Sequence, residues 1–185
     1  MNTWVYRGFK TNIFIIERLK SMINVSNDGQ MICLRNCEVF KTNFTGNEER
    51  RNGQIVNNEG ARYFLVWLDE DDAKELEADN WALKWTKPRP DSDPDYRPRA
   101  YMKINVAYPR NYPKLWPKIV LHSGEDKINI YEDTVEQIDH EDITSIKVEF
   151  RARVNRDTGI KKAYAATIYV YVRQDPFAND DDLFE

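Results

Sequence analysis

The chain has 185 residues, of which 41% are hydrophobic and 12% aromatic, so it can bury a core and is not a disordered chain. Its formal net charge is -4, from 31 acidic and 27 basic residues. No run approaches the roughly 20 apolar residues of a membrane span. These features predict a soluble, cytoplasmic protein without a membrane partner.

Residues 1–21 carry neither a signal peptide nor a recognisable fold pattern. The apolar run Ile13–Ile16 is followed at once by Glu17 and Arg18, with no small-residue cleavage site. Met22 directly precedes the first fold pattern, so we expect residues 1–21 to be an N-terminal extension upstream of the native start. One domain is expected over residues 22–173, followed by an acidic disordered tail over residues 174–185.

The first half of the domain alternates between strands and connections. Loose alternation of apolar residues predicts a strand over residues 30–40, and the Gly- and Asn-rich residues 42–60 are expected to form a mobile loop. The apolar run 61–68 predicts a strand that is covered on both faces or lined by a ligand. Asp69 is the expected N-cap of a short helix, after which residues 81–86 return to strand periodicity.

The second half begins with a connection over residues 87–99, which contains four prolines and so predicts extended chain. Residues 101–108 alternate cleanly, which places Tyr101 and Lys103 together on the outward face. The last and longest hairpin turns at residues 155–159. Shorter elements are predicted between them: a loop over 109–117, strands over 119–122 and 127–131, and a brief helix over 132–138.

Many short strands with one or two short helices favour a small barrel or sandwich over a parallel α/β sheet. The outward faces of these strands combine flat rings with positive charge. In the last hairpin we expect Arg151 and Arg153 to lie opposite Tyr169 and Tyr171. Rings stack on unpaired bases and cations hold phosphates, so such a face predicts sequence-tolerant binding of single strands.

The predicted binding residues form two groups. Phe64 and Trp81 lie among apolar neighbours at strand spacing and are equally explained as core, so they are left out. The main group is Tyr101, Lys103, Arg151, Arg153, Lys161, Lys162, Tyr169 and Tyr171, and the further candidates are Arg62, Lys84 and Trp85.

Nothing in the sequence indicates an enzyme, a metal site or a cofactor. The chain has two cysteines, Cys33 and Cys37, whose spacing fits neither a redox pair nor a zinc set, and two widely separated histidines. Gly-rich phosphate loops and the GxSxG elbow of hydrolases are absent from the sequence. We therefore predict reduced thiols and a protein without catalytic activity.

The last eleven residues, 175–185, are acidic and contain no Lys or Arg. Without their five carboxylates, 26 acidic residues stand against 27 basic ones, so the rest of the chain carries a net charge of about +1. A carboxylate run imitates phosphate and can compete for the binding groove, while an apolar pair can anchor a partner protein. The predicted tail motif is Asp180, Asp181, Asp182, Leu183 and Phe184.

Several short motifs, taken in order, resemble the bacteriophage single-stranded DNA-binding proteins with an OB-fold. The motifs are Asn43-Phe44-x-Gly46, Gly60-x-Arg62-x-Phe64, Asn80-Trp81-x-x-Lys84-Trp85, Pro117-Lys118-Ile119-Val120 and Gly159-Ile-Lys-Lys-Ala-Tyr164, in a similarity that runs from about Cys37 to Arg173. The resemblance implies a mainly β, OB-fold-like five-stranded barrel with one or two short helices and long loops. It also implies a protein that coats single strands during DNA replication, recombination or repair, in the host cell cytoplasm, with a tail that engages replication or recombination proteins. Two departures are Glu185 after the tail Phe and Asn80 where Gly is expected.

Two other classes of protein fit the same residues. A single-stranded RNA-binding protein or RNA chaperone would use the same rings and cations, and only the 2′-hydroxyl would separate it. A β-sandwich interaction or virion structural module would need no basic groove and would bind no nucleic acid.

Overall fold

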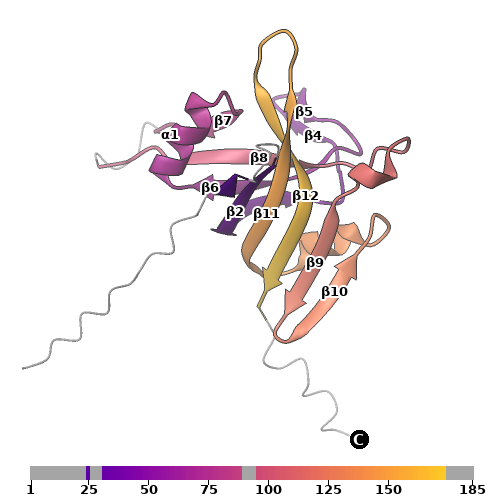
Figure 1. Cartoon of the computed structure of the whole chain (residues 1–185). Helices are drawn as coiled ribbons and strands as arrows, with labels where there is room; N and C mark the ends of the chain where they lie inside the picture. Colours follow the sequence, from indigo (N-terminus) through magenta and orange to yellow (C-terminus); the bar gives the residue numbers. More distant parts are fainter. Residues whose placement is uncertain (1–23, 26–30, 89–94, 174–185) are drawn as a thin grey trace, which may run out of the picture.

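The structure, a computed structural model, describes residues 24–25, 31–88 and 95–173 of the chain. Strands dominate, as predicted: within these residues ten strands form one sheet and two more form a separate hairpin (Figure 1). The described residues also contain one α-helix and two 3-10 helices. In chain order the elements are β1 (Asn24–Val25), β2 (Met31–Cys37), β3 (Val39–Asn43), β4 (Glu49–Arg51), β5 (Gln54–Asn57), β6 (Arg62–Leu68), α1 (Glu70–Ala78), β7 (Leu83–Trp85), β8 (Ala100–Val106), η1 (Pro113–Leu115), β9 (Lys118–Ser123), β10 (Asp126–Ile130), η2 (Val135–His140), β11 (Ile143–Val154) and β12 (Lys161–Val172).

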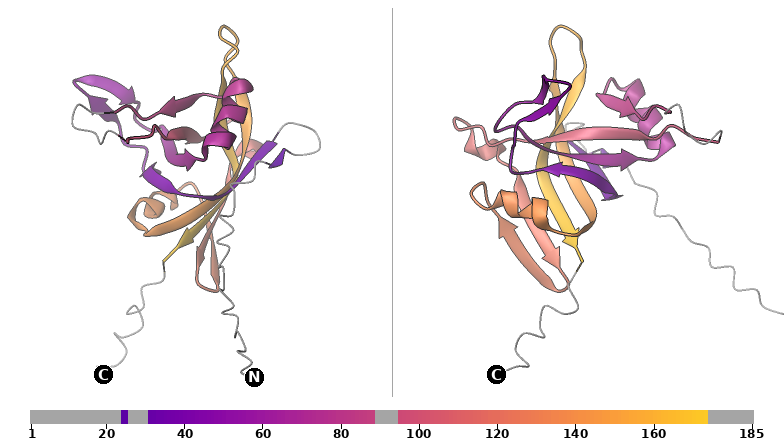
Figure 2. Two further views of the ribbon diagram at one scale, coloured as in Figure 1. Left: turned by 90° about the vertical axis from the view of Figure 1, so that its left-hand side faces the viewer. Right: turned by 180° about the vertical axis from the view of Figure 1, so that it is seen from behind.

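The predicted first strand bends at Glu38 and takes part in two different pairings. Its first half, β2, pairs antiparallel with β11, and its second half, β3, pairs antiparallel with β6. At the bend, the Trp67 backbone N–H donates to the Glu38 carbonyl at 3.0 Å. The path from β2 through β11, β12, β8 and β6 to β3 therefore begins and ends on neighbouring stretches of chain, and the sheet curls round the core (Figure 2).

Alternation along the strands builds the core inside this curl. On β8, Met102, Ile104 and Val106 point inward and are buried, as the sequence predicts. Phe64 and Trp81, for which the sequence leaves a core role and a binding role equally open, are both buried in the core. Because β8 buries every second side chain, the residues between them necessarily face outward.

The predicted five-stranded barrel needs one correction. β8 pairs with β12 only at Ala163 and Tyr164, which leaves the rest of this edge of the 12-residue β12 open. Strand β9 fills that edge in parallel and brings β10 with it, while β7 branches from β8. The result is a large curled sheet with OB-fold-like order, rather than a closed barrel of five strands.

Two shorter predictions also change. The expected loop over residues 42–60 contains the β4–β5 hairpin, whose turn residues Asn52 and Gly53 have φ values of 51° and 78°. The brief helix predicted over residues 132–138 is the 3-10 helix η2, shifted toward the C-terminus. The predicted N-terminal extension and acidic tail lie outside the described residues. No helix in the described part of the chain is long and apolar enough to cross a membrane.

Candidate nucleic-acid interface

The outward faces of β3, β6 and β8 form the floor of a groove. The strand register places Leu65 beside both Lys41 and Lys103, and Trp67 beside Tyr101. A hollow of about 560 Å³ lies over this floor. Its lining comprises Lys41, Glu49, Arg51, Val56, Tyr63, Leu65, Ala82, Leu83, Lys84, Tyr101, Lys103, Asn105 and Lys162.

Three separate parts of the chain make the walls of the groove. The β4–β5 hairpin contributes Arg51 and Val56, β7 contributes Lys84, and the start of β12 contributes Lys162. Seen from behind, β8 crosses the molecule, and the β4–β5 hairpin and α1 with β7 both stand above it, toward its two ends (Figure 2). In OB-folds, the second and third strands and the loops that flank them form the ligand face. Here these strands are β6 and β8.

The groove is strongly basic, because five cationic side chains line it against the single carboxylate of Glu49 within the described residues. Lys103 lies at the centre and is half-buried. Burial, together with the like charges of Lys84, Lys41 and Lys162, lowers the pKa of Lys103 despite the opposing attraction of Glu49. This crowding of positive charge is what an incoming anion would relieve.

Aromatic rings extend the groove at one end of β8. Phe40 stacks on Trp67 at a centroid distance of 4.1 Å, and Tyr101 meets both rings edge-on at 5.4 and 5.8 Å. The Arg99 guanidinium lies 4.4 Å from the centroid of the Trp67 ring. Phe40 is 41% exposed, so the cluster presents ring surface to solvent as well as to its own members. Such surface is suited to stacking by unpaired bases.

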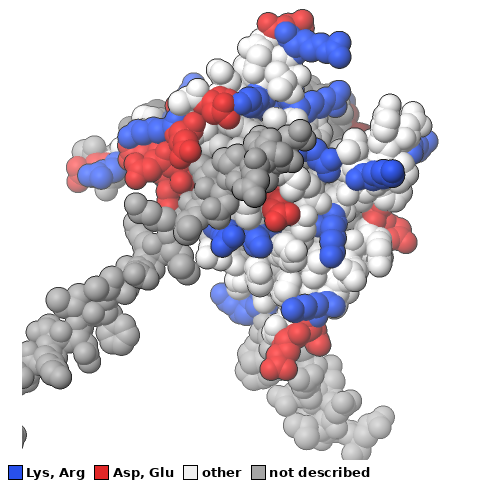
Figure 3. Space-filling model, viewed as in Figure 1, with Lys and Arg blue, Asp and Glu red and all other residues white. Residues whose placement is uncertain are grey.

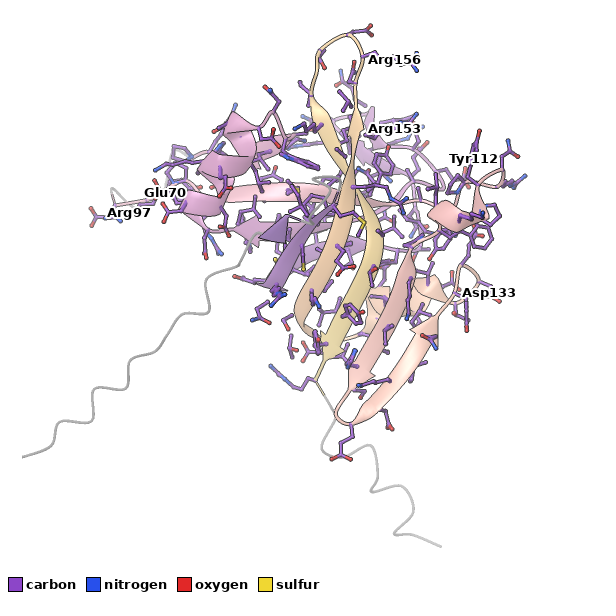
Figure 4. The ribbon with its side chains drawn as sticks, viewed as in Figure 1. Glu70, Arg97, Tyr112, Asp133, Arg153 and Arg156 are labelled. Carbon is purple, nitrogen blue, oxygen red and sulfur yellow. The ribbon has the colours of Figure 1, made fainter. Side chains whose placement is uncertain are left out.

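At the other end of β8, beyond Asn105 of the groove, lies a second hollow of about 460 Å³. Tyr164 pairs with Asn105 of the groove floor and also lines this hollow. The Arg153 guanidinium lies 5.8 Å from the Tyr164 ring centroid, and Arg151 donates to the Leu115 carbonyl at 3.3 Å. Figure 4 shows Arg153 on the long hairpin and Tyr112, another lining residue, on the loop that precedes β9 (Figure 4).

The structure brings six of the predicted binding residues together along this track. Lys84, Tyr101, Lys103 and Lys162 line the central groove, and Arg151 and Arg153 line the adjoining hollow. Their strands are distant in the sequence, and the parallel pairing of β8 with β12 joins them.

Three further candidates do not line the central groove. Arg62 alternates with the groove residue Tyr63, and its guanidinium lies 3.6 Å from the carboxylate of Glu132. Lys161 pairs with Asp79 at 2.6 Å. Trp85 lines a hollow beside α1 that Trp67 and Arg99 of the aromatic cluster also line, and its indole N–H donates to Glu77 at 3.4 Å.

The expected pairing of Arg151 and Arg153 with Tyr169 and Tyr171 is wrong. Hairpin register is counted from the turn, so Arg151 lies opposite Tyr164 and Arg153 opposite Lys162. Tyr169 and Tyr171 lie opposite Lys147 and Ser145 on the half of β12 that pairs with β9. There both rings lie close to the His122 ring, at centroid distances of 5.9 and 4.8 Å.

Sequence reasoning missed several groove residues. Tyr63 and Trp67 share the outward face of β6 with Leu65, and strict alternation along residues 61–68 would have indicated this. Lys41 falls just after the strand predicted over residues 30–40, which in fact continues to Asn43. Arg51 had no local signal, because its position depends on the folding of the β4–β5 hairpin over the sheet.

The rest of the described surface differs from the groove in charge (Figure 3), and it offers no metal site. Acidic residues gather over α1, whereas Lys and Arg are spread over the long hairpin and the neighbouring strands (Figure 3). Among the described residues, no cluster of His, Cys, Asp and Glu could hold a metal ion. Cys33 and Cys37 are free thiols, both buried.

Comparison with known proteins gives one family match. The model of the family described as "Putative phage ssDNA-binding domain" matches residues 23–181. No curated protein matches the chain.

Among solved structures, the chain is similar to the single-stranded DNA-binding protein from bacteriophage Enc34, at 10% identity and a TM-score of 0.45, over 91% of this chain and 100% of that one. The same protein in complex with ssDNA aligns at 9% identity and a TM-score of 0.45, over 88% and 99% of the two chains. Its C-terminal truncation aligns at 12% identity and a TM-score of 0.44, over 87% and 98%. A likeness this distant supports no assignment of residues.

Proposed function

Since the chain belongs to the phage single-stranded DNA-binding domain family and is thus a single-stranded DNA-binding protein, we propose that the groove over β3, β6 and β8 holds the DNA. One observation carries this proposal: rings and cations share a single outward face along β8. The DNA path runs from the Phe40–Trp67–Tyr101 cluster, across Lys103, to the hollow at Tyr164 and Arg153.

The chemistry of the groove favours unpaired bases without reading their sequence. A strand with unpaired bases offers flat rings to stack on and a regular row of phosphates, which cations hold. The amide nitrogens of Asn43, Asn57 and Asn105 already donate to backbone carbonyls, at 2.9, 2.8 and 2.9 Å. Rings and cations therefore supply the main contacts, and these do not discriminate between bases.

The role we propose is protection of exposed single strands in phage DNA replication, recombination or repair, in the cytoplasm of the host and without catalysis. The folded domain supplies a basic groove with walls that can hold a polyanion such as single-stranded DNA. The acidic segment with Asp180, Asp181, Asp182, Leu183 and Phe184 lies outside the described residues, and we propose that it recruits replication or recombination proteins and competes for the groove.

The deciding experiment is a titration of the full chain with oligo-dT while tryptophan fluorescence is followed at several salt concentrations. Trp67 belongs to the aromatic cluster, so a bound base should quench its emission, and salt should weaken the binding. A parallel titration with oligo-U distinguishes RNA from DNA. Fluorescence quenching that does not depend on salt, or no quenching with either polymer, would refute the proposal that the groove binds DNA.

A further inference from the structure

Glu49 is the one acidic residue among the described residues that line the groove, and it lies where a bound anion would lie. Its carboxylate accepts from Lys41 Nζ at 2.7 Å, from the Tyr63 hydroxyl at 2.7 Å and from the Asn43 amide at 2.9 Å. An ammonium, a hydroxyl and an amide thus converge on one pair of anionic oxygens. The same donors would suit the oxygens of a backbone phosphate.

The donors and the acceptor belong to different parts of the fold. Lys41 and Asn43 lie on β3 and Tyr63 on β6, all within the main sheet, whereas Glu49 begins the separate β4–β5 hairpin. No strand pairing in the described residues joins this hairpin to the main sheet. The hairpin can therefore withdraw its carboxylate without breaking a β-ladder, and the three donors remain in place.

A second polar contact holds the base of the hairpin over the groove. Asn57 is the cross-strand partner of Glu49, and its Oδ1 accepts from Lys103 Nζ at 2.9 Å. Lys103 also lies 3.8 Å from the centroid of the Tyr63 ring. The hairpin is thus held by Lys41 and Lys103, two of the cations that a nucleic-acid backbone would need.

Given the proposed function, we propose that Lys41, Tyr63 and Asn43 form a phosphate subsite and that Glu49 is its resident competitor. In the free protein the carboxylate fills the subsite and latches the hairpin over the groove. A strand that enters the groove exchanges a phosphate for the carboxylate at Lys41 and loosens the latch. Burial opposes ionisation of Glu49, but the hydrogen bonds from Lys41 and Tyr63 outweigh it and lower the pKa of this carboxyl, as expected for a carboxylate that is held as an anion.

The test compares Glu49→Gln with Glu48→Gln. Both variants lose one negative charge from neighbouring positions, but Glu48 pairs with Arg50 at 2.6 Å and does not line the groove. Affinity for oligo-dT is measured from 50 to 400 mM salt. With Glu49→Gln we expect affinity to rise about three- to tenfold at low salt, and the slope of log K against log salt to steepen by about 0.7, because Lys41 now releases a counterion. With Glu48→Gln we expect less than about a twofold change.

The gain must pass through Lys41. In a Lys41→Gln background, Glu49→Gln should therefore add nothing, and a gain that persists there overturns the subsite. Thermal melting of each variant verifies that it is folded. If Glu49→Gln alone melts at a lower temperature, the double variant Lys41→Gln with Glu49→Gln, which removes both charges, is compared with Lys41→Gln to test the same coupling.

The phosphate subsite can prove wrong while the proposed DNA-binding function remains correct. If the wild-type chain binds oligo-dT with strong salt dependence while both Gln variants bind alike, the subsite is wrong and the groove stands. If the wild-type chain does not bind, the proposed function itself is wrong.

Discussion

Replacing Lys103 by Met should weaken single-strand binding and reduce its dependence on salt. Lys103 is the half-buried cation at the centre of the groove, and it lies beside Tyr63. Met keeps an unbranched apolar side chain over the ring and removes the ammonium group, with its charge and its hydrogen bond to Asn57. Any loss of affinity that follows is therefore assigned to the ammonium group rather than to packing.

The structure sets the size of the effect. Five cations line the groove and Glu49 opposes one of them, so four or five phosphate contacts are available. At roughly -0.7 per phosphate on a single strand, the slope of log K against log salt should be roughly -2.8 to -3.5. Between 50 and 200 mM salt the affinity should then fall by roughly 50- to 130-fold. Lys103→Met should make this slope shallower by about 0.7 and cost about tenfold in affinity at low salt.

Fluorescence anisotropy of a labelled dT oligomer across this salt range measures both quantities. Lys147→Met is the matched control, because Lys147 also lies over a tyrosine ring, Tyr169, at 5.0 Å, but on the β11–β12 face outside the groove. Loss of the Lys103–Asn57 hydrogen bond is checked by thermal melting of the variant. Equal effects of the two Met variants, or an unchanged slope for Lys103→Met, would refute the reasoning.

Three other outcomes follow from the same structure. Tyr101→Ala should weaken binding of a short dT oligomer by about tenfold through lost stacking, whereas Tyr169→Ala should leave it unchanged in the same titration; equal losses would contradict the path along β8. Asp139→Asn should lower the free energy of unfolding by about 1–2 kcal/mol in urea titrations, because the Asp139 carboxylate accepts hydrogen bonds from the Phe44 and Thr45 backbone and the Thr45 hydroxyl. Burial opposes ionisation of Asp139, but these hydrogen bonds outweigh it and lower the pKa of its carboxyl. The difference in unfolding free energy between wild type and variant should therefore be complete above the ordinary pKa of Asp and should vanish as pH falls through the lowered pKa of Asp139. A difference that does not depend on pH would show that the negative charge of Asp139 is not its cause. Ending the chain after Arg173 should tighten DNA binding, most at low salt, and unchanged or weaker binding would remove the competition by the tail.

Alternation of apolar and polar residues correctly predicted which side chains of a single strand face outward, but the pairing of strands decided which of these side chains become neighbours. Tyr101 and Lys103 were placed outward from the pattern of β8 alone, since burial on a pleated strand has a period of two. Tyr169 and Tyr171 were also placed on the outward face of β12, but their neighbours depended on the turn and on the bulge between Glu149 and Phe150. Sequence pattern carries little information about such register.

The residues that the sequence could not bring together are those that act across separate elements. In the sequence, Glu49 is one charge in a predicted polar loop and Lys41 lies just after a predicted strand. The two side chains meet only because the β4–β5 hairpin folds over β3. That contact depends on the turn at Asn52 and Gly53 and on Asn57, whose amide N–H donates to the Ala61 carbonyl at 2.8 Å. The hairpin is thus positioned by polar contacts rather than by hydrophobic periodicity, which is the main signal that a sequence offers.

The same arrangement explains how a groove of like charges persists in the folded protein without DNA. Repulsion among Lys41, Lys84, Lys103 and Lys162 opposes the compact state, and the pKa of Lys103 is lowered partly for this reason. Glu49 offsets part of this repulsion from inside the groove, at the position where a phosphate would do so in the complex. If that exchange occurs, Glu49→Gln should bind DNA more tightly and yet melt at a lower temperature than wild type when DNA is absent. A carboxylate with only a structural role would lower the melting temperature without raising the affinity.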